Sequence, residues 1–257
     1  MGRRLGVLLA MLLAVALGWT GPAHADPLPL PGDTDVDYQL GGAWDDVPDH
    51  VGIVERDRTD PPLGGRYNIC YVNGFQTQPN EKRFWRHHWS LVLQDGGRPV
   101  VDSAWGEWLL DLRTPAKRRA LARVMGHWVK GCADDGYDAV EFDNLDSFTR
   151  SHHLLERRQA IGYARLLVRG AHRNGLAAGQ KNLAGFDGTT IGFDFAVAEE
   201  CGRWDECDRY AAAYGDQVIA VEYRKKDFHA TCRAYGDQWP VERRNLALTP
   251  GGVHAWC

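Results

Sequence analysis

The chain has 257 residues, of which 34 are acidic and 30 are Lys or Arg, so its formal net charge at pH 7 is −4. This balance argues against nucleic acid or an anionic membrane as the main partner, because both bind strongly basic surfaces. Six cysteines occur without any Cys-x2-Cys pair, which favours three disulfides in an oxidising compartment over a zinc site.

The N-terminus has the features of a secretory signal peptide. Two arginines precede an apolar run at 5–19, and the triplet Ala-His-Ala at 23–25 follows it. The run is shorter than the roughly 20 residues that span a bilayer, so a cleaved signal fits better than a membrane anchor. We expect removal of residues 1–25 and secretion of residues 26–257 as a single domain without membrane attachment.

Eight short apolar or β-branched runs predict strands, and each run ends in polar residues. They lie at 36–40, 51–57, 67–73, 137–144, 176–182, 193–200, 218–223 and 243–248. Amphipathic patterns, each closed by glycine, predict helices at 115–136, 154–175 and 205–215. Alternating strands and helices without a Gly-rich phosphate loop predict an α/β fold of the (β/α)8 TIM-barrel type. Residues 74–114 are poorly patterned, so we expect long βα loops in the first half of the barrel.

The predicted strand at 137–144 runs apolar and then becomes acidic. Side chains alternate along a strand, so Ala139, Glu141 and Asp143 share one face while Val140 and Phe142 share the other. The apolar face should meet the helices. Both carboxylates should therefore point to the mouth of the barrel, where active sites of this fold lie.

Other strand ends carry similar groups: Glu199 and Glu200, Glu222 with Tyr223, and Lys181 with Asn182. Several carboxylates that converge with a lysine, amides and a tyrosine suit glycosidic bond cleavage. One carboxyl group protonates the leaving oxygen, and another attacks or stabilises the anomeric carbon. Aromatic side chains in the loops would stack on sugar faces.

Each of these residues also has a simpler structural interpretation. A strand-terminal acid such as Asp146 is often a helix N-cap, and Lys181 could serve only as an ion-pair partner. The tryptophans at 85, 89, 105 and 108 could be packing residues. The convergence on several strands favours a site.

Five segments resemble glycoside hydrolase family 114, the endo-α-1,4-polygalactosaminidase family. They are DYQLGGAW (37–44), RYNICYVNGFQTQP (66–79), DAVEFDNLDSF (138–148), GQKN (179–182) and FDFAVAEECGRWDEC (193–207). The resemblance implies a TIM-barrel enzyme that acts on α-1,4-linked galactosamine polymers. It also implies that Asp143 is the nucleophile and Glu199 the acid/base. Family members commonly carry Pro and Tyr where this chain has Phe142 and Phe148, a difference that leaves both carboxylates in place.

The sequence thus predicts a secreted, monomeric, endo-acting glycosidase that needs no cofactor or metal and cleaves a partly or fully deacetylated polymer. Candidate substrate-binding residues, all near strand ends, are Gln39, Asp57, Tyr71, Asn73, Glu141, Asn144, Lys181, Asn182, Glu222 and Tyr223. Two alternatives stay open: a secreted barrel that binds carbohydrate without cleaving it, and a metal-dependent polysaccharide deacetylase. The latter would need paired histidine ligands, for which the sequence offers only 87–88 and 152–153.

One cysteine pairing, out of 15 that six cysteines allow, keeps every bridge local in the sequence. The expected pairs are Cys201–Cys207, Cys232–Cys257 and, as the remaining pair, Cys70–Cys132.

Overall fold

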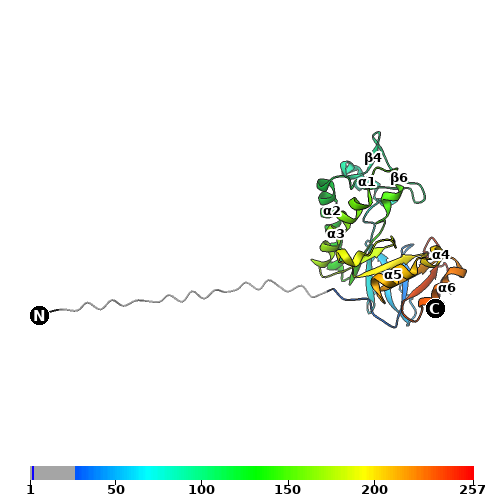
Figure 1. The fold of residues 1–257 in the computed structure, drawn as a ribbon. Coiled ribbons are helices and arrows are strands. Elements are labelled where there is room, and N and C mark those ends of the chain that lie inside the picture. Colours follow the sequence, from blue (N-terminus) through cyan, green and yellow to red (C-terminus); the bar gives the residue numbers. More distant parts are fainter. Residues whose placement is uncertain (1, 3–26) are drawn as a thin grey trace.

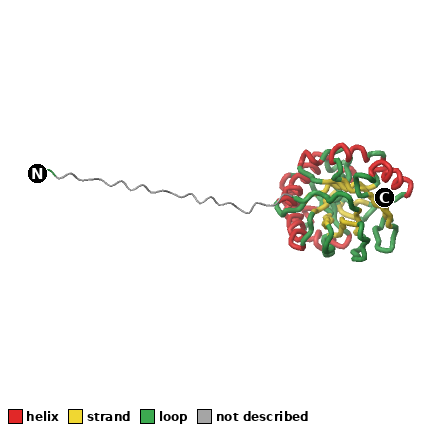
Figure 2. The backbone as a smooth tube through the Cα atoms, turned by 90° about the horizontal axis from the view of Figure 1, so that it is seen from below, coloured by secondary structure: helices red, strands yellow, loops and turns green. Residues whose placement is uncertain are grey.

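The computed structural model describes Gly2 and residues 27–257, so apart from Gly2 the expected signal peptide lies outside the described residues. Eight parallel strands surround a central axis, and helices cover the outside of most of them (Figures 1 and 2). The strands, in order around the sheet, are β1 (Asp35–Gln39), β2 (Val51–Asp57), β3 (Tyr67–Val72), β8 (Ala139–Phe142), β9 (Ala177–Lys181), β10 (Phe195–Glu199), β11 (Val218–Glu222) and β12 (Val241–Arg244). The predicted TIM barrel is confirmed.

Side-chain alternation divides the core into two layers. Ala139 packs inside the barrel with Ile53, Ile69 and other inward residues, whereas Val140 and Phe142 pack outside it against the helices. The predicted division of strand β8 into an inward and an outward face is therefore confirmed.

The barrel closes between β12 and β1 through side chains. The backbone N–H of Tyr38 donates to Glu242 Oε2 at 2.9 Å, and the buried guanidinium of Arg244 contacts Asp37 Oδ1 at 3.1 Å. A ninth strand, β13 (His254–Trp256), pairs antiparallel with β12, and the indole of Trp256 donates to Val36 O at 2.6 Å. The sheet edges are thus covered without a direct β12–β1 ladder in the described chain.

The outer helices are α2 (Pro115–Asp135), α3 (Arg157–His172), α4 (Cys201–Trp204), α5 (Cys207–Tyr214) and α6 (Lys225–Tyr235). Helix α2 has strong end signals: Thr114 accepts the Lys117 N–H, Pro115 follows, and Gly136 ends the helix at a φ of 94°. The predicted helices at 115–136, 154–175 and 205–215 correspond to α2, α3 and α5. Helix α6 was not predicted, and β1 and β2 are followed by loops rather than helices.

The last predicted strand is misplaced. The structure has β12 at Val241–Arg244 instead of 243–248, and residues 246–248 form part of a loop at the barrel mouth. The segment is apolar although it is not a strand, because the loop buries Leu248 against the inner core.

The long connection from β3 to α2 carries its own small elements, as expected for the first half of the barrel. They are η1 (Pro79–Glu81), α1 (Lys82–His87), η2 (Trp89–Leu91) and two hairpins, β4 (Gln94–Asp95) with β5 (Arg98–Pro99) and β6 (Val101–Asp102) with β7 (Glu107–Trp108). Two further short helices, η3 (Ser147–Arg150) and η4 (Gly188–Ile191), follow β8 and β9. The β6–β7 hairpin reaches the mouth of the barrel, where it forms one wall of the site described below.

All three predicted disulfides are present. Cys70–Cys132 joins β3 to α2, Cys201–Cys207 joins α4 to α5, and Cys232–Cys257 ties the C-terminus to α6. None of the helices within the described part of the chain is long and apolar enough to cross a membrane.

Candidate active site

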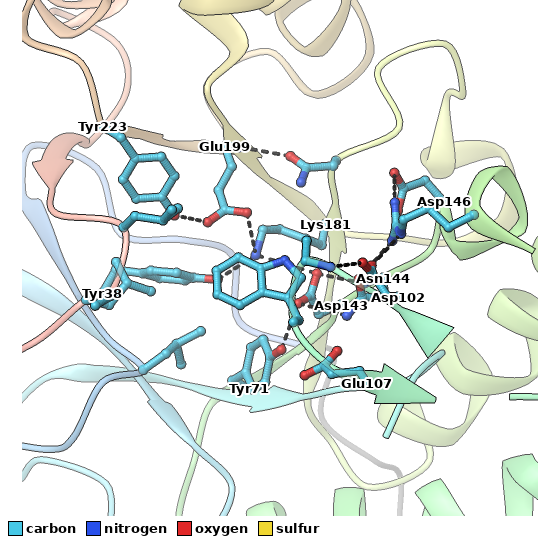
Figure 3. Close-up of a pocket in the computed structure, with 18 residues that line it drawn as sticks. Tyr38, Tyr71, Asp102, Glu107, Asp143, Asn144, Asp146, Lys181, Glu199 and Tyr223 are labelled. Carbon is cyan, nitrogen blue, oxygen red and sulfur yellow. Dashed lines mark hydrogen bonds and ion pairs between the residues drawn. The ribbon is translucent and has the colours of Figure 1, made fainter. Parts of the chain in front are cut away.

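The carboxyl ends of the barrel strands enclose a pocket of about 360 Å³. Acidic side chains dominate its polar wall, and a single lysine lies at its centre (Figure 3). The lining residues are Tyr38, Leu40, Tyr71, Asp102, Ala104, Trp105, Glu107, Asp143, Asn144, Asp146, Arg150, Lys181, Asn182, Glu199, Tyr223, Leu246, Ala247 and Leu248.

Lys181, the last residue of β9, connects three carboxylates. Its Nζ lies 3.2 Å from Glu141 Oε1, 3.3 Å from Glu199 Oε2 and 3.7 Å from Asp143 Oδ1. Burial by itself lowers the pKa of this ammonium, but Asp143, Glu141 and Glu199 outweigh that effect and hold the pKa well above its usual value. Lys181 is therefore a permanent cation at neutral pH.

Asp143 follows the last residue of β8 and points into the pocket with a side chain that is 19% exposed. Its Oδ2 accepts a hydrogen bond from the Tyr71 hydroxyl at 2.7 Å, and its Oδ1 accepts the Asn144 N–H at 2.6 Å. Asn144 has a φ of 66°, a conformation that Asn tolerates better than most residues and that turns the chain away at the strand end. These donors fix the orientation of the Asp143 carboxylate.

Glu199, the last residue of β10, reaches the pocket from the next strand but one. The Tyr223 hydroxyl donates to its Oε1, and Lys181 contacts its Oε2. Asn182 supports the same strand end, because its side-chain oxygen accepts the Glu199 backbone N–H at 2.9 Å. Burial and the adjacent Glu199 carboxylate raise the pKa of Tyr223, so its hydroxyl stays a proton donor.

The carboxyl groups of Asp143 and Glu199 lie close together. Asp143 Oδ1 and Glu199 Oε2 are 3.7 and 3.3 Å from the same nitrogen, so these two oxygens are separated by at most the sum of the distances, 7.0 Å. In glycosidases the two catalytic carboxyl groups lie about 5 to 9.5 Å apart, and the upper bound of 7.0 Å is compatible with that range.

Beneath the pocket, Glu141 is fully buried and accepts from the Tyr38 hydroxyl at 3.2 Å. Glu55 on β2 is also fully buried, and neither of its carboxyl oxygens has a hydrogen-bond partner among the described residues. Burial raises the pKa of both groups, that of Glu141 to about 7. Of these two acids, Glu141 contacts Lys181 from below the pocket.

The β6–β7 hairpin supplies a second acidic wall. Asp102 contacts Arg150 Nε at 2.7 Å, and Arg150 also contacts Asp146 Oδ2 at 2.8 Å. Glu107 accepts from Asn73 Nδ2 at 2.9 Å, and Trp105 at the hairpin tip is 55% exposed.

The model of glycoside hydrolase family GH114 matches residues 19–257. The chain belongs to this family. It is therefore a glycosidase, and the pocket at the mouth of its barrel is the candidate active site.

Solved structures with the same fold include two that this GH114 chain covers almost completely. Ega3 from Aspergillus fumigatus, in a crystal structure with galactosamine, is 21% identical, with 91% of this chain and 100% of that chain covered and a TM-score of 0.72. The glycoside hydrolase domain of PelA from Pseudomonas aeruginosa is 15% identical, with 87% of this chain and 98% of that chain covered and a TM-score of 0.59. The search of curated proteins gives no match.

The structure brings together seven of the twelve residues that the sequence suggested for this GH114 site. Those that line the pocket are Asp143, Glu199, Tyr71, Asn144, Lys181, Asn182 and Tyr223. Their roles in catalysis and binding remain predictions.

The other five candidates lie behind the pocket wall. Gln39 accepts from Arg56 Nε at 2.8 Å, Asp57 accepts from Gln78 at 2.6 Å, and Asn73 and Glu141 bind the side chains described above. Glu222 accepts the Gly202 N–H at 2.7 Å and the Thr231 hydroxyl at 3.0 Å, which connects β11 to α4 and α6. Their contacts orient the strand ends and the residues that line the pocket.

The sequence reasoning missed the hairpin wall. Asp102, Trp105 and Glu107 fall in the poorly patterned segment, and Arg150 lies in η3, so no strand end pointed to them. Asp146, for which a helix N-cap was the simpler interpretation, makes no capping bond and instead pairs with Arg150 in the pocket wall.

The four tryptophans of the first long connection divide between packing and the pocket. Trp85 is fully buried, and Trp89 and Trp108 pack against the outer core. Of these four, Trp105 alone lines the pocket.

Two residue groups in the described chain have the spacing of metal ligands. In the first, Cys201 and Cys207 already form a disulfide. In the second, Asp37 and Glu242 surround the guanidinium of Arg244, which occupies the position of a cation. Neither group lines the pocket, and nor do the histidine pairs that a deacetylase would have used.

Proposed function

We propose that this protein is a secreted, endo-acting glycosidase that cleaves α-1,4-linked galactosamine polymers with retention of anomeric configuration. Family membership supports the reaction type, and the galactosamine in the Ega3 complex supports the sugar by analogy. Three disulfides support an oxidising destination. We also expect the protein to act as a monomer.

In the proposed first step, the Asp143 carboxylate attacks the anomeric carbon. The bond from that carbon to the leaving oxygen breaks, and the leaving oxygen takes a proton from the Glu199 carboxyl group. In the second step Glu199 accepts a proton from water, the water oxygen bonds to the anomeric carbon, and the ester bond to Asp143 breaks.

The observation that carries this proposal is the position of Lys181 between the two carboxyl groups. A fixed cation 3.7 Å from Asp143 and 3.3 Å from Glu199 compensates negative charge in the pocket at every stage of the cycle. Tyr71 and Tyr223 donate one hydrogen bond to each carboxyl group, so both are oriented before substrate arrives.

The polymer's charge should contribute to recognition. Five carboxyl groups line the pocket, at positions 102, 107, 143, 146 and 199, against the cations Arg150 and Lys181. A polymer with protonated amines would be attracted, and a uronate would be repelled. We therefore expect faster cleavage of deacetylated than of fully acetylated oligomers, with an advantage that shrinks as salt shortens the Debye length to about 3 Å at 1 M.

The test is product analysis with a defined α-1,4-galactosamine oligomer and its N-acetylated counterpart at low and high salt. Internal cleavage by the wild-type protein, together with near-complete loss in Asp143→Asn and Glu199→Gln, is the expected result. Each substitution removes an ionisable group and almost no volume, so melting temperature should report an intact fold. Ordinary activity in either variant would remove that residue from the mechanism. Binding without any cleavage by the wild-type protein would favour a non-catalytic carbohydrate-binding barrel.

A further inference from the structure

The pocket contains more carboxyl groups than cations, and the ion pairs show which carboxyl group is left over. Lys181 contacts Asp143 and Glu199, while Arg150 contacts Asp102 and Asp146. The fifth lining carboxyl group, that of Glu107, forms no ion pair with any Lys, Arg or His in the described residues.

Glu107 is held rigidly at the base of the β6–β7 hairpin, where it is 8% exposed. Its Oε2 accepts from Asn73 Nδ2 at 2.9 Å. The amide of Gln76, in the orientation that satisfies its neighbours, donates to the same oxygen at 3.2 Å. Both donors therefore reach one oxygen, and Oε1 has no hydrogen-bond partner among the described residues, so it can bind a group in the pocket.

The surroundings of Glu107 disfavour the negative charge of its carboxylate. Burial raises its pKa to about 7, the carboxylates of Asp143 and Asp102 act in the same direction, and Asn73 and Arg150 act against it. Tyr71 also faces this group and has its own pKa raised, chiefly by burial and by Asp143 and in part by Glu107. A buried carboxylate of this kind is stabilised when a cation enters beside it.

We propose that Glu107 determines substrate specificity by binding the protonated amino group of a galactosamine unit in the pocket. The inference rests on the proposed function, since it names the side chain that would read the amine. An N-acetyl group carries no charge and would leave Glu107 without a counter-ion. A neutral hydroxyl in the same place would make a weaker hydrogen bond.

This role would couple substrate binding to the protonation state of Glu107. Ammonium binding favours the ionised form of Glu107, so below pH 7 the complex should release a proton as it forms. The affinity for a free-amine oligomer should then weaken up to about tenfold for each pH unit below 7, as long as the amine itself stays protonated. The N-acetylated oligomer should lack this dependence.

The experiment measures Kd by calorimetry in the Glu199→Gln protein, which should bind oligomers without cleaving them. Galactosamine and N-acetylgalactosamine pentamers are compared with and without Glu107→Gln. The expected result is an increase of about tenfold or more in Kd for the free-amine pentamer and little change for the acetylated one. Asp95→Asn, which removes an exposed carboxylate on β4 outside the pocket, is the matched control and should change neither value.

The outcomes separate the two proposals. An unchanged ratio of the two affinities in Glu107→Gln, while the wild-type protein cleaves the polymer, would overturn the role of Glu107 alone. No cleavage and no binding by the parent proteins would overturn the proposed function and this inference together. If Glu107→Gln fails to fold, proton release at pH 6 on binding of the free-amine pentamer to the Glu199→Gln protein decides the question, and its absence counts against Glu107.

Discussion

Glu222 provides a quantitative test of how the buried acids of this barrel work. Its side chain is fully buried, and its Oε2 has no hydrogen-bond partner. Burial raises its pKa from 4.5 to about 7, although the Gly202 N–H and the Thr231 hydroxyl oppose that effect. Between pH 4.5 and 7 the folded protein therefore keeps a proton that the unfolded chain has lost, and the free energy of unfolding falls as pH rises.

The size of that loss follows from the two pKa values. They differ by about 2.5 pH units, and at about 1.36 kcal/mol per unit the loss is about 3 kcal/mol, complete above pH 7. Glu222→Gln keeps the shape and the acceptor but cannot ionise. Relative to wild type, the variant should gain about 3 kcal/mol between pH 4 and pH 8.5, or about 6–12 °C in melting temperature.

Urea unfolding at pH 4, 6 and 8.5, with the disulfides intact, measures this gain. Asp237→Asn, which removes an exposed carboxylate after α6, controls for the change in net charge. If the free energy of unfolding depends on pH in the same way in wild type and in Glu222→Gln, the reasoning is refuted, because Glu222 would then not have a raised pKa in the folded protein.

Three further changes test other parts of the structure. Lys181→Met should lower kcat by more than about a hundredfold and the free energy of unfolding at pH 8 by about 3–5 kcal/mol, since the buried carboxylates lose their cation. Steady-state activity equal to that of the wild-type protein would contradict the central position of Lys181. Trp105→Ala should raise KM for long oligomers about three- to tenfold without changing the melting temperature, because the indole is 55% exposed over the pocket. An unchanged KM would show that Trp105 does not touch sugar. Replacing Cys232 and Cys257 by Ser should cost about 3 kcal/mol in urea unfolding, since this bridge closes a separation of 25 residues; a loss below about 1 kcal/mol would show that the bridge adds little.

The fold could be predicted largely from local patterns. Alternation along β8 placed Ala139 inward and Val140 outward, and the structure agrees. Helix α6 was not predicted because its buried face is small and consists mainly of Phe228 and Thr231 among charged neighbours. The closure of the barrel could not be predicted from local sequence patterns, because Arg244 and Asp37 are 207 positions apart in the chain.

The site was predictable only where strand geometry applies. Residues at the ends of β8, β9, β10 and β11 alternate predictably, which is why Asp143, Lys181 and Glu199 were identified together with Tyr223. The direction of a hairpin that is inserted between β3 and α2 depends on tertiary packing, so Glu107 could not be assigned to the pocket from its neighbours in sequence. A position at a strand end is also not sufficient, because Glu222 ends β11 and yet its side chain contacts α4 and α6 rather than the pocket.

The central claim, that Asp143 attacks the sugar while Glu199 handles the proton, can be tested most directly by trapping the intermediate. Glu199→Gln would be mixed with α-galactosaminyl fluoride, whose leaving group needs little protonation, and the digested protein would be examined by mass spectrometry. The account predicts a glycosyl adduct on the peptide that contains Asp143, with none in the Asp143→Asn, Glu199→Gln double variant. Fluoride release with β-configured product and no adduct at Asp143 would contradict it.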